Sequence, residues 1–290
     1  MPLAVALPCA VMSAVAYGTA TAVQHRAAHR GTGRADARGV LRLVRDPRWL
    51  ASVGGDTVGL ALQVVALATG PVLLVQPLLV LAVPVALPVG RLLGGPSPTW
   101  QDYAACVGIL GSLAVFFLLV GNPGQASPLP AAQAAWTTVA AAALGGVLFS
   151  AVRTASSTVR AAIYGAVAGA WFGFVGVLLD AVSTTWQRSG SAGLTQPDGW
   201  VPLVCLLLVG AGALVLTQVS FQVGTLAASF PANEATAPVV AVVLGAALLH
   251  ERLPLSAGHV AAYLLCVAVV AAGAVQLARG LSSEPPEHRP

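Results

Sequence analysis

Nine apolar runs, each about as long as a bilayer-spanning helix, make up most of this 290-residue chain. A helix that crosses the hydrocarbon core of a membrane needs roughly 20 apolar residues. Hydropathy and Gly, Pro and Ser punctuation set the limits of the runs. We therefore predict an all-α, polytopic membrane protein with spans at residues 3–24, 49–69, 71–93, 100–121, 133–152, 160–181, 200–221, 226–249 and 256–278.

The composition argues against the soluble classes of protein. The chain is 57% hydrophobic and 8% charged, whereas an average soluble domain is about 25% charged. The sequence has no Ser/His/Asp or Cys/His set, no phosphate loop and no paired-His metal motif. We expect no enzymatic activity, no metal and no cofactor. The four cysteines lie inside apolar runs without CxxC spacing and are expected to be small buried hydrophobic residues.

The arginines predict the orientation of the chain. All 14 basic residues are Arg, and 12 of them fall in the first loop, the alternate connectors on the same side and the C-terminal tail. Arg and Lys concentrate in cytoplasmic loops, so we expect a plasma (inner) membrane protein with its N-terminus outside and its C-terminus in the cytoplasm. The Arg-rich loop 25–48 lacks interleaved aromatic residues. We expect it to face anionic lipid rather than nucleic acid.

An internal repeat relates the two halves of the chain. A shift of 154 residues places Gly70 on Gly224, Pro77 on Pro231 and Pro84 on Pro238. With one residue of adjustment, Tyr17-Gly18 in the first span meets Phe172-Gly173 in the sixth. The first four spans therefore resemble the last four, and the fifth lies between them.

The repeat predicts the domain organisation. We expect a first repeat at residues 1–132, a connecting transmembrane helix at 133–158, a second repeat at 159–279 and a disordered cytoplasmic tail at 280–290. Because an odd number of crossings separates the two repeats, this 4+1+4 arrangement is inverted. Inverted repeats recur in secondary transporters, which bind their substrate near the membrane midplane.

The third and eighth spans are interrupted by proline at corresponding positions. A proline within a helix removes one backbone hydrogen bond and clashes one turn back, and in lipid the freed carbonyl needs another partner or a cavity. Pro77, Pro84, Pro231 and Pro238 are thus expected to bend helices around a central cavity. The alternative is that they bend helices only for packing.

Two carboxylates are predicted to lie within spans. Glu234 lies between the prolines of the eighth span, and Asp56 lies about two turns into the second. An acid facing lipid as an anion is costly, and the spans place no base deep enough to pair with either residue. We expect Glu234 and Asp56 to bind a proton or a cation on a transport pathway. Alternatively, each is a protonated, hydrogen-bonded acid that only holds helices together.

Four amides are further candidates for the same pathway: Gln76, Asn233, Gln63 and Gln218. Gln76 and Asn233 flank kink prolines, and Gln63 is seven residues after Asp56 and so shares its helix face. These side chains could hydrate a cavity or bind a substrate. The alternative is hydrogen bonding between helices.

Other charged residues are expected to be solvated at the ends of spans. Asp180 ends the sixth span, Glu251 and its neighbours His250 and Arg252 end the eighth, and Asp102 begins the fourth. Small-residue patterns at Gly165, Gly169 and Gly173, and at Gly55 and Gly59, permit close helix approach. We expect these patterns to pack helices of one chain rather than to form a homodimer, which stays open as an alternative.

Two long segments resemble the drug/metabolite transporter superfamily of EamA-type proteins. They are DTVGLALQVVALATGPVLLVQPLLVLAVPVALP in the first half and LTQVSFQVGTLAASFPANEATAPVVAVVLGAALLHERL in the second. The opening YGTATAVQHRA and the nine-span plan also look like the NIPA-type branch, which implies magnesium transport. Where that branch tends to have Asn-Glu-Arg, this chain has Val89-Gly90-Arg91, without the acid.

The repeat and the resemblance together favour one function. We expect a secondary-active transporter that moves a small metabolite or drug-like solute by alternating access, and more specifically an exporter. A magnesium or other divalent-cation transporter is the alternative in the same class. A non-transporting membrane scaffold or accessory protein is the alternative from another class.

Overall fold

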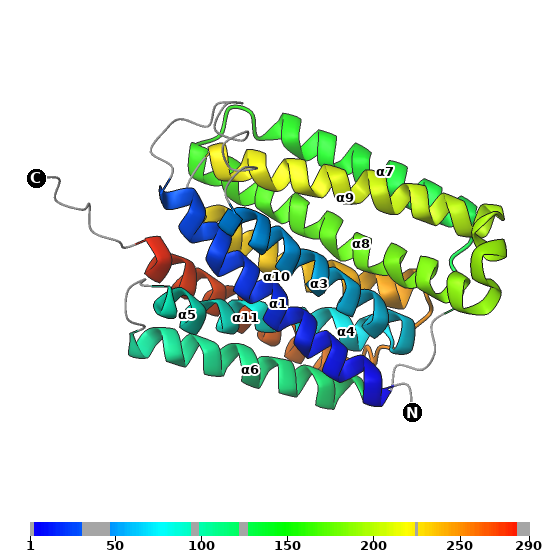
Figure 1. Cartoon of the computed structure of the whole chain (residues 1–290), viewed down its shortest axis with the longest axis horizontal. Coiled ribbons are helices and arrows are strands. Elements are labelled where there is room, and N and C mark those ends of the chain that lie inside the picture. The colour runs from blue at the N-terminus through cyan, green and yellow to red at the C-terminus, as the bar shows by residue number, and fades with distance from the viewer. Residues whose placement is uncertain (1–2, 31–46, 94–98, 122–126, 224–225, 283–290) are drawn as a thin grey trace, which may run out of the picture.

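The computed structural model describes residues 3–30, 47–93, 99–121, 127–223 and 226–282, and within these ranges it has helices and no strand. The Arg-rich stretch 31–46 and the tail beyond 282 lie outside the described residues. Figure 1 shows the elements in chain order: α1 (Leu3–Arg30), α3 (Pro47–Thr69), α4 (Val72–Leu78), the 3-10 turn η1 (Leu79–Leu81), α5 (Ala82–Leu92), α6 (Trp100–Val120), α7 (Ala131–Ala151), α8 (Ser157–Leu194), α9 (Pro197–Val223), α10 (Leu226–Leu248) and α11 (Ala257–Ser282).

The described helices identify a multi-pass membrane protein. Eight of them, with α4 to α5 counted as one, are long and apolar enough to cross a membrane, and the apolar part of α10 is the shorter Ala232–Leu248. Large apolar side chains are exposed on the outer helices, and Leu118 of α6 is 84% exposed. Trp100 and Trp136 are exposed near the ends of their helices. Such a surface suits lipid rather than water.

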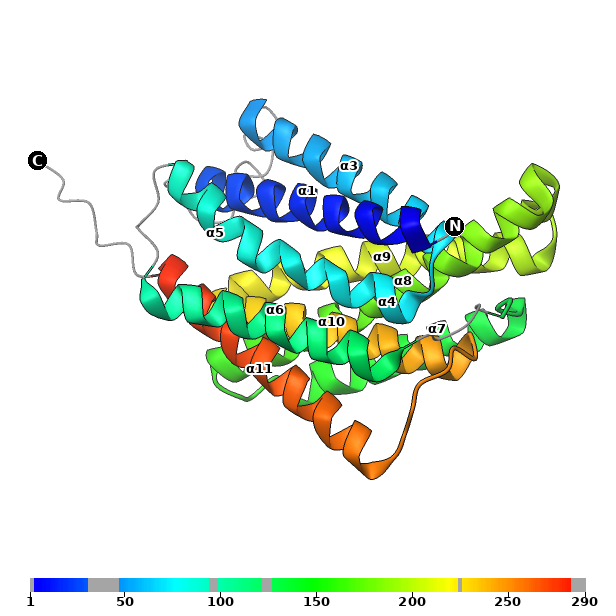
Figure 2. The same ribbon diagram turned by 90° about the horizontal axis from the view of Figure 1, so that it is seen from below.

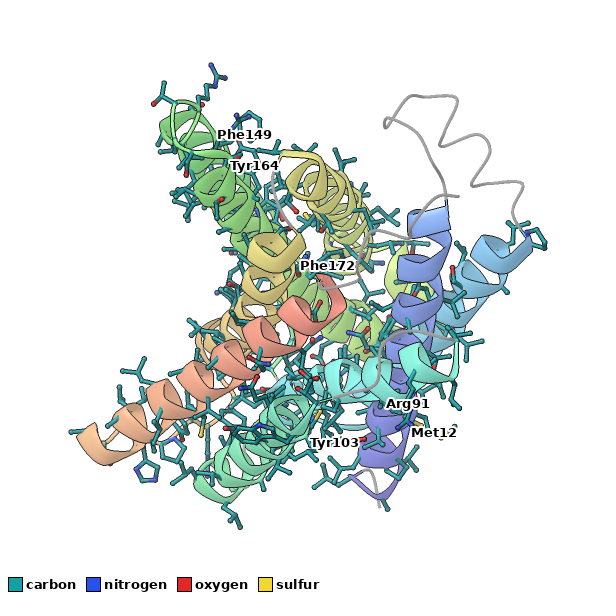
Figure 3. The ribbon with its side chains drawn as sticks, turned by 90° about the vertical axis from the view of Figure 1, so that its left-hand side faces the viewer. Met12, Arg91, Tyr103, Phe149, Tyr164 and Phe172 are labelled. Atoms are coloured by element: carbon teal, nitrogen blue, oxygen red, sulfur yellow. The ribbon has the colours of Figure 1, made fainter. Side chains whose placement is uncertain are left out.

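Two long helices, α8 and α10, lie at the centre of the bundle. α8 contacts α3, α7, α9 and α10, and α10 also contacts α4, α9 and α11. Figures 1 and 2 show α6 beside α11 at one edge of the molecule. In the end-on view of Figure 3, Phe149 of α7 stacks on Tyr164 of α8, with ring centroids 4.6 Å apart. This contact fixes α7 against the first turns of α8.

Glycines bring α8 and α10 into backbone contact. A Cβ on Gly165, Gly169 or Gly173 would overlap the backbone carbonyl oxygens of Ser229, Asn233 and Ala237, respectively. The four-residue spacing places all three glycines on one face of α8. The predicted use of this pattern as a packing surface within one chain is confirmed.

The first two helices pack by the same principle. A Cβ on Gly59 would lie 3.0 Å from the ring of Tyr17, and one on Gly55 would lie 3.3 Å from the Cβ of Ala20. The Ser13 hydroxyl donates a 2.7 Å hydrogen bond to the Gly59 carbonyl. Small residues on α3 thus let α1 approach closely enough for a buried hydroxyl to reach the backbone.

The third predicted span is divided, whereas the eighth is continuous. Residues 79–81 form the 3-10 turn η1 between α4 and α5. Pro84, three residues after this turn, has no N–H to donate to the carbonyl of Val80, which lies within the turn. α10 runs as one helix from Leu226 to Leu248 through Pro238.

The sixth predicted span is much longer than expected. We predict a helix over 160–181 followed by a polar connector, but α8 extends from Ser157 to Leu194. The polar residues after Asp180 continue the helix, and the Thr185 hydroxyl bonds to the Ala181 carbonyl in the preceding turn. Gly190, with φ 57° and ψ −147°, interrupts the helix near its end. Asp180 therefore lies inside a helix and not at its solvated end.

Candidate functional site

The structure brings Asp56 and Gln63 together on the α1–α3 interface. The Tyr17 hydroxyl donates a 3.0 Å hydrogen bond to Oε1 of Gln63, and Asp56 lies close enough to interact electrostatically with Tyr17. Asp56 is half-buried and Gln63 is buried. Tyr17, which the sequence marks as part of the repeat and not as a site residue, joins the two predicted polar residues.

The candidates on α10 lie apart from that cluster. Nδ2 of Asn233 donates a 3.2 Å hydrogen bond to Oγ1 of Thr217 on α9, which is an interhelical bond. Glu234 is half-buried, and no hydrogen bond or ion pair joins its carboxylate to another described side chain. The side chains of Gln218 and Pro231 lie outside the described residues.

Gln76 lies between α4 and α8. Its carboxamide lies against Gly176, where a Cβ would overlap it. The side chain is 5% exposed, and its Nε2 has no hydrogen-bond partner among the described residues. An unpaired buried donor is unfavourable, so this amide is a candidate donor to a ligand oxygen.

The expectation that Asp180, Glu251 and Asp102 are solvated is wrong. Asp180 and Glu251 are each 3% exposed, and Asp102 is 4% exposed. Asp102 forms a capping box with Thr99 at the start of α6, and its carboxylate accepts the Thr99 N–H at 2.7 Å. His250 and Arg252 are exposed, as expected.

Glu251 binds the first turn of α4 with both carboxylate oxygens. Oε1 accepts the N–H of Val72 at 2.8 Å and Oε2 accepts the N–H of Leu73 at 2.9 Å. The first N–H groups of a helix have no partner within it and carry partial positive charge. Burial raises the pKa of Glu251, and the two N–H donors offset part of that rise.

A tight turn after α10 delivers Glu251 to this position. His250 adopts a left-handed conformation with φ 55°. The N–H groups of Leu249 and Glu251 both donate to the carbonyl of Gly245. The left-handed residue that ends a helix is most often Gly, and here it is His250. The Ser127 N–H donates to the Leu249 carbonyl at 2.8 Å and covers the turn.

Asp180 lies near enough to Glu251 for the two carboxyl groups, which we call the acid pair, to act on each other electrostatically. The two carboxyl groups interact electrostatically, and Arg188, an exposed residue two turns further along α8, attracts Asp180. Gly176 and Asp180 are four residues apart and share a face of α8. We call Gln76, Gly176, Asp180 and Glu251 the α4–α8 seam.

The seam could bind a proton, a water molecule or a small cation. It contains two buried carboxyl groups, an unpaired amide and a helix N-terminus. One sequence signal could have identified Asp180, because apolar residues flank it on both sides. No comparable signal marks Glu251, whose partners on α4 are 179 and 178 residues away.

A shallow groove between α6 and α11 is a weaker candidate for a ligand-binding site. Small apolar residues line it, with Gln101 and Gln276 as its polar members. Gln276 donates weakly to Gln101 at 3.3 Å. The α4–α8 seam therefore remains the stronger candidate site.

The comparisons with known proteins show a family relationship. An uncharacterized protein of Corynebacterium glutamicum is 30% identical over 254 residues, which cover 84% of each chain. This chain belongs to the same family as that protein. No protein-family model matches the chain, and no solved structure matches it.

Proposed function

We propose that this chain is a secondary transporter of the drug/metabolite type, built from two inverted four-helix repeats that alternate access to a small solute. The observation that carries the proposal is a duplicated packing contact. A Cβ on Gly18 of α1 would overlap the Ala82 carbonyl and approach the Cβ of Val85, and a Cβ on Gly173 of α8 would overlap the Ala237 carbonyl and approach the Cβ of Val240. Each residue of the second set follows its counterpart by 155 positions (18 and 173, 82 and 237, 85 and 240), which is one more than the shift of 154 that aligns Pro84 with Pro238.

The larger packing pattern supports the same division. α1 packs on α3 and α5, and α8 packs on α9 and α10. α6 and α11, the last helix of each proposed repeat, pack against each other. α7 lies between the repeats in sequence, so the second repeat has the opposite orientation. Inverted repeats let one unit rock against the other around a midplane site.

The proposed pathway lies along the divided third span and α10. Glu234 and Asp56 are its proposed proton or cation sites. The Arg distribution favours a cytoplasmic position for the Arg91 end of α5 and an outer position for the Glu251 end of the molecule. With the prediction of export, this orientation makes the α4–α8 seam the exit side.

A ligand screen followed by a flux assay tests the proposal. Purified protein is screened by thermal shift against metabolites, drug-like compounds and divalent ions, because a ligand that binds only the folded state raises its melting temperature. A compound that raises it is then followed across proteoliposome membranes under a proton gradient. We expect Glu234→Gln and Asp56→Asn to lose proton-driven flux, and Asp198→Asn, at an exposed acid, to retain it. Full, proton-independent transport by both former variants would contradict the mechanism.

A further inference from the structure

The α4–α8 seam encloses two carboxyl groups, and ionising both of them at once is unfavourable in free energy. Asp180 and Glu251 are both buried and interact electrostatically. Two carboxylates that share a buried site repel each other, so one of them tends to keep its proton. The N–H groups of Val72 and Leu73 stabilise one negative charge at this site.

Gln76 gives an independent indication that the seam holds a ligand. Its Nε2 is buried without a partner, and the carboxamide lies on Gly176, one helical turn from Asp180 on the same face of α8. An amide donor beside the acid pair favours an oxygen acceptor over a metal cation. A carboxylate oxygen of the acid pair can accept this N–H. A water molecule that exchanges protons with the carboxylate can accept it equally well.

Among the residues that the structure describes, Arg188 is the charge besides Glu251 that acts on Asp180. Arg188 lies on α8 and is exposed, and His250 and Arg252 flank Glu251 and are also exposed. α4 (Val72–Leu78) contains no titratable residue. No buried basic side chain among the described residues neutralises the second carboxylate of the acid pair, so a bound proton must do so.

We propose that Asp180 and Glu251 bind one proton between them while the α4–α8 seam is closed, and that they release it to the outer solution when the seam opens. This inference rests on the proposed transport function and adds a proton-coupling site at the outer end of the molecule. In the open seam water solvates both carboxylates, and both ionise near neutral pH. The reaction is a proton dissociation and needs no other reactant.

The sign of the pH dependence follows from proton linkage. The closed seam binds one proton more than the open seam, so acid favours closure and alkali favours opening. One linked proton changes the ratio of open to closed seam by up to about tenfold per pH unit.

Cysteine labelling measures this ratio in the full-length protein. In a background with Cys9, Cys106, Cys205 and Cys266 replaced by Ala, Ser183→Cys places a thiol beside Asp180 in the buried part of α8. Thr195→Cys gives a matched exposed thiol near the end of the same helix. The ratio of their rates with a membrane-impermeant maleimide removes the intrinsic pH dependence of the thiol.

We expect that ratio to fall several-fold as pH is lowered from about 7.5 to about 5.5, a range above the usual pKa of Asp and Glu. Asp180→Asn, which resembles the protonated acid, should keep the ratio low at both pH values, and Asp198→Asn should behave like the unsubstituted acid. A pH-independent ratio with Asp180 intact, or an unchanged pH response in Asp180→Asn, would overturn the proposal.

Infrared spectroscopy provides a second readout without any cysteine. The spectrum at about pH 7 should contain the carbonyl band of a protonated carboxylic acid that Asp180→Asn or Glu251→Gln removes and Asp198→Asn retains. Absence of any band lost with either variant would overturn the one-proton site. If the labelling response and the band are present while no solute flux is found, the proton site stands and the transport proposal fails. If solute flux is found while the labelling response and the band are absent, the proton site is contradicted and the transport proposal stands.

Discussion

Single residues at the Glu251 end carry unusual local interactions. Glu251 binds two backbone N–H groups of a helix that lies 178 or more positions away in the chain. His250 supports this geometry with a left-handed backbone. Both features tie the turn after α10 to the start of α4.

The first prediction concerns the carboxylate of Glu251. Glu251→Gln keeps the size of the side chain but replaces a charged acceptor by a neutral one, and we expect the folded state to lose about 1–3 kcal/mol. Hydrogen exchange at the amides of Val72 and Leu73 should become faster, because a carboxamide has one oxygen acceptor for the two N–H groups and that oxygen is uncharged. Arg252→Gln changes the exposed neighbour and should leave both measurements unchanged. Equal protection of the two amides in Glu251→Gln would show that the carboxylate does not hold this turn.

The second prediction concerns the left-handed conformation of His250. Glycine adopts positive φ without the clash that a Cβ meets. We expect His250→Gly to raise the free energy of unfolding by about 1 kcal/mol and therefore to raise the melting temperature. His250→Ala retains a Cβ and should give no gain. Equal melting temperatures for the two variants would contradict the left-handed turn.

At the scale of elements, the apolar runs predict where the helices lie, because a bilayer-spanning helix needs a long apolar stretch whatever its partners are. The error at α8 has a physical cause. The segment from Val182 to Ser189 is too polar to read as a span, yet it continues the helix beyond Asp180. Hydropathy measures how strongly a segment prefers lipid to water. A helical segment that extends beyond the lipid, or that packs inside a bundle, can be polar and still be helical.

The third prediction concerns the contact between α8 and α10. Gly169→Ala would push a Cβ into the Asn233 carbonyl and separate the two central helices. We expect a loss of about 1–3 kcal/mol, as for overpacked cores, seen as a lower melting temperature. Gly111→Ala on α6 is the matched control, because no atom lies within 4 Å of its added Cβ. Ala is a stronger helix former than Gly, so a control as destabilised as Gly169→Ala would show that the contact with Asn233 does not set the effect.

At the scale of the whole molecule, the sequence predicts the division of residues between lipid and interior better than it predicts the site. Asp180 and Glu251 look like residues at the ends of spans, and only the folded chain shows that both turn inward. Whether a terminal carboxylate meets water or a helix N-terminus depends on packing between segments far apart in sequence. The i to i+7 pairing of Asp56 with Gln63 could be predicted, because it depends on one helix alone.

The duplicated contacts of Gly18 and Gly173 support the proposal that the two halves of the chain are repeats of one unit. If the two repeats alternate between an inward-open and an outward-open state, a residue between them must be accessible from each side of the membrane in turn. Asn233, buried between α10 and α9 near the proposed midplane, is a suitable reporter.

The most direct measurement is side-specific labelling of Asn233→Cys in oriented vesicles, in the background free of the native cysteines. Membrane-impermeant maleimide is added to one side at a time, and Thr195→Cys reports the reactivity of a thiol exposed on one side only. The proposal predicts that the thiol at position 233 reacts from both sides, and that a compound found in the ligand screen changes the two rates in opposite directions. Reaction from neither side, or from one side alone under all conditions, would contradict alternating access.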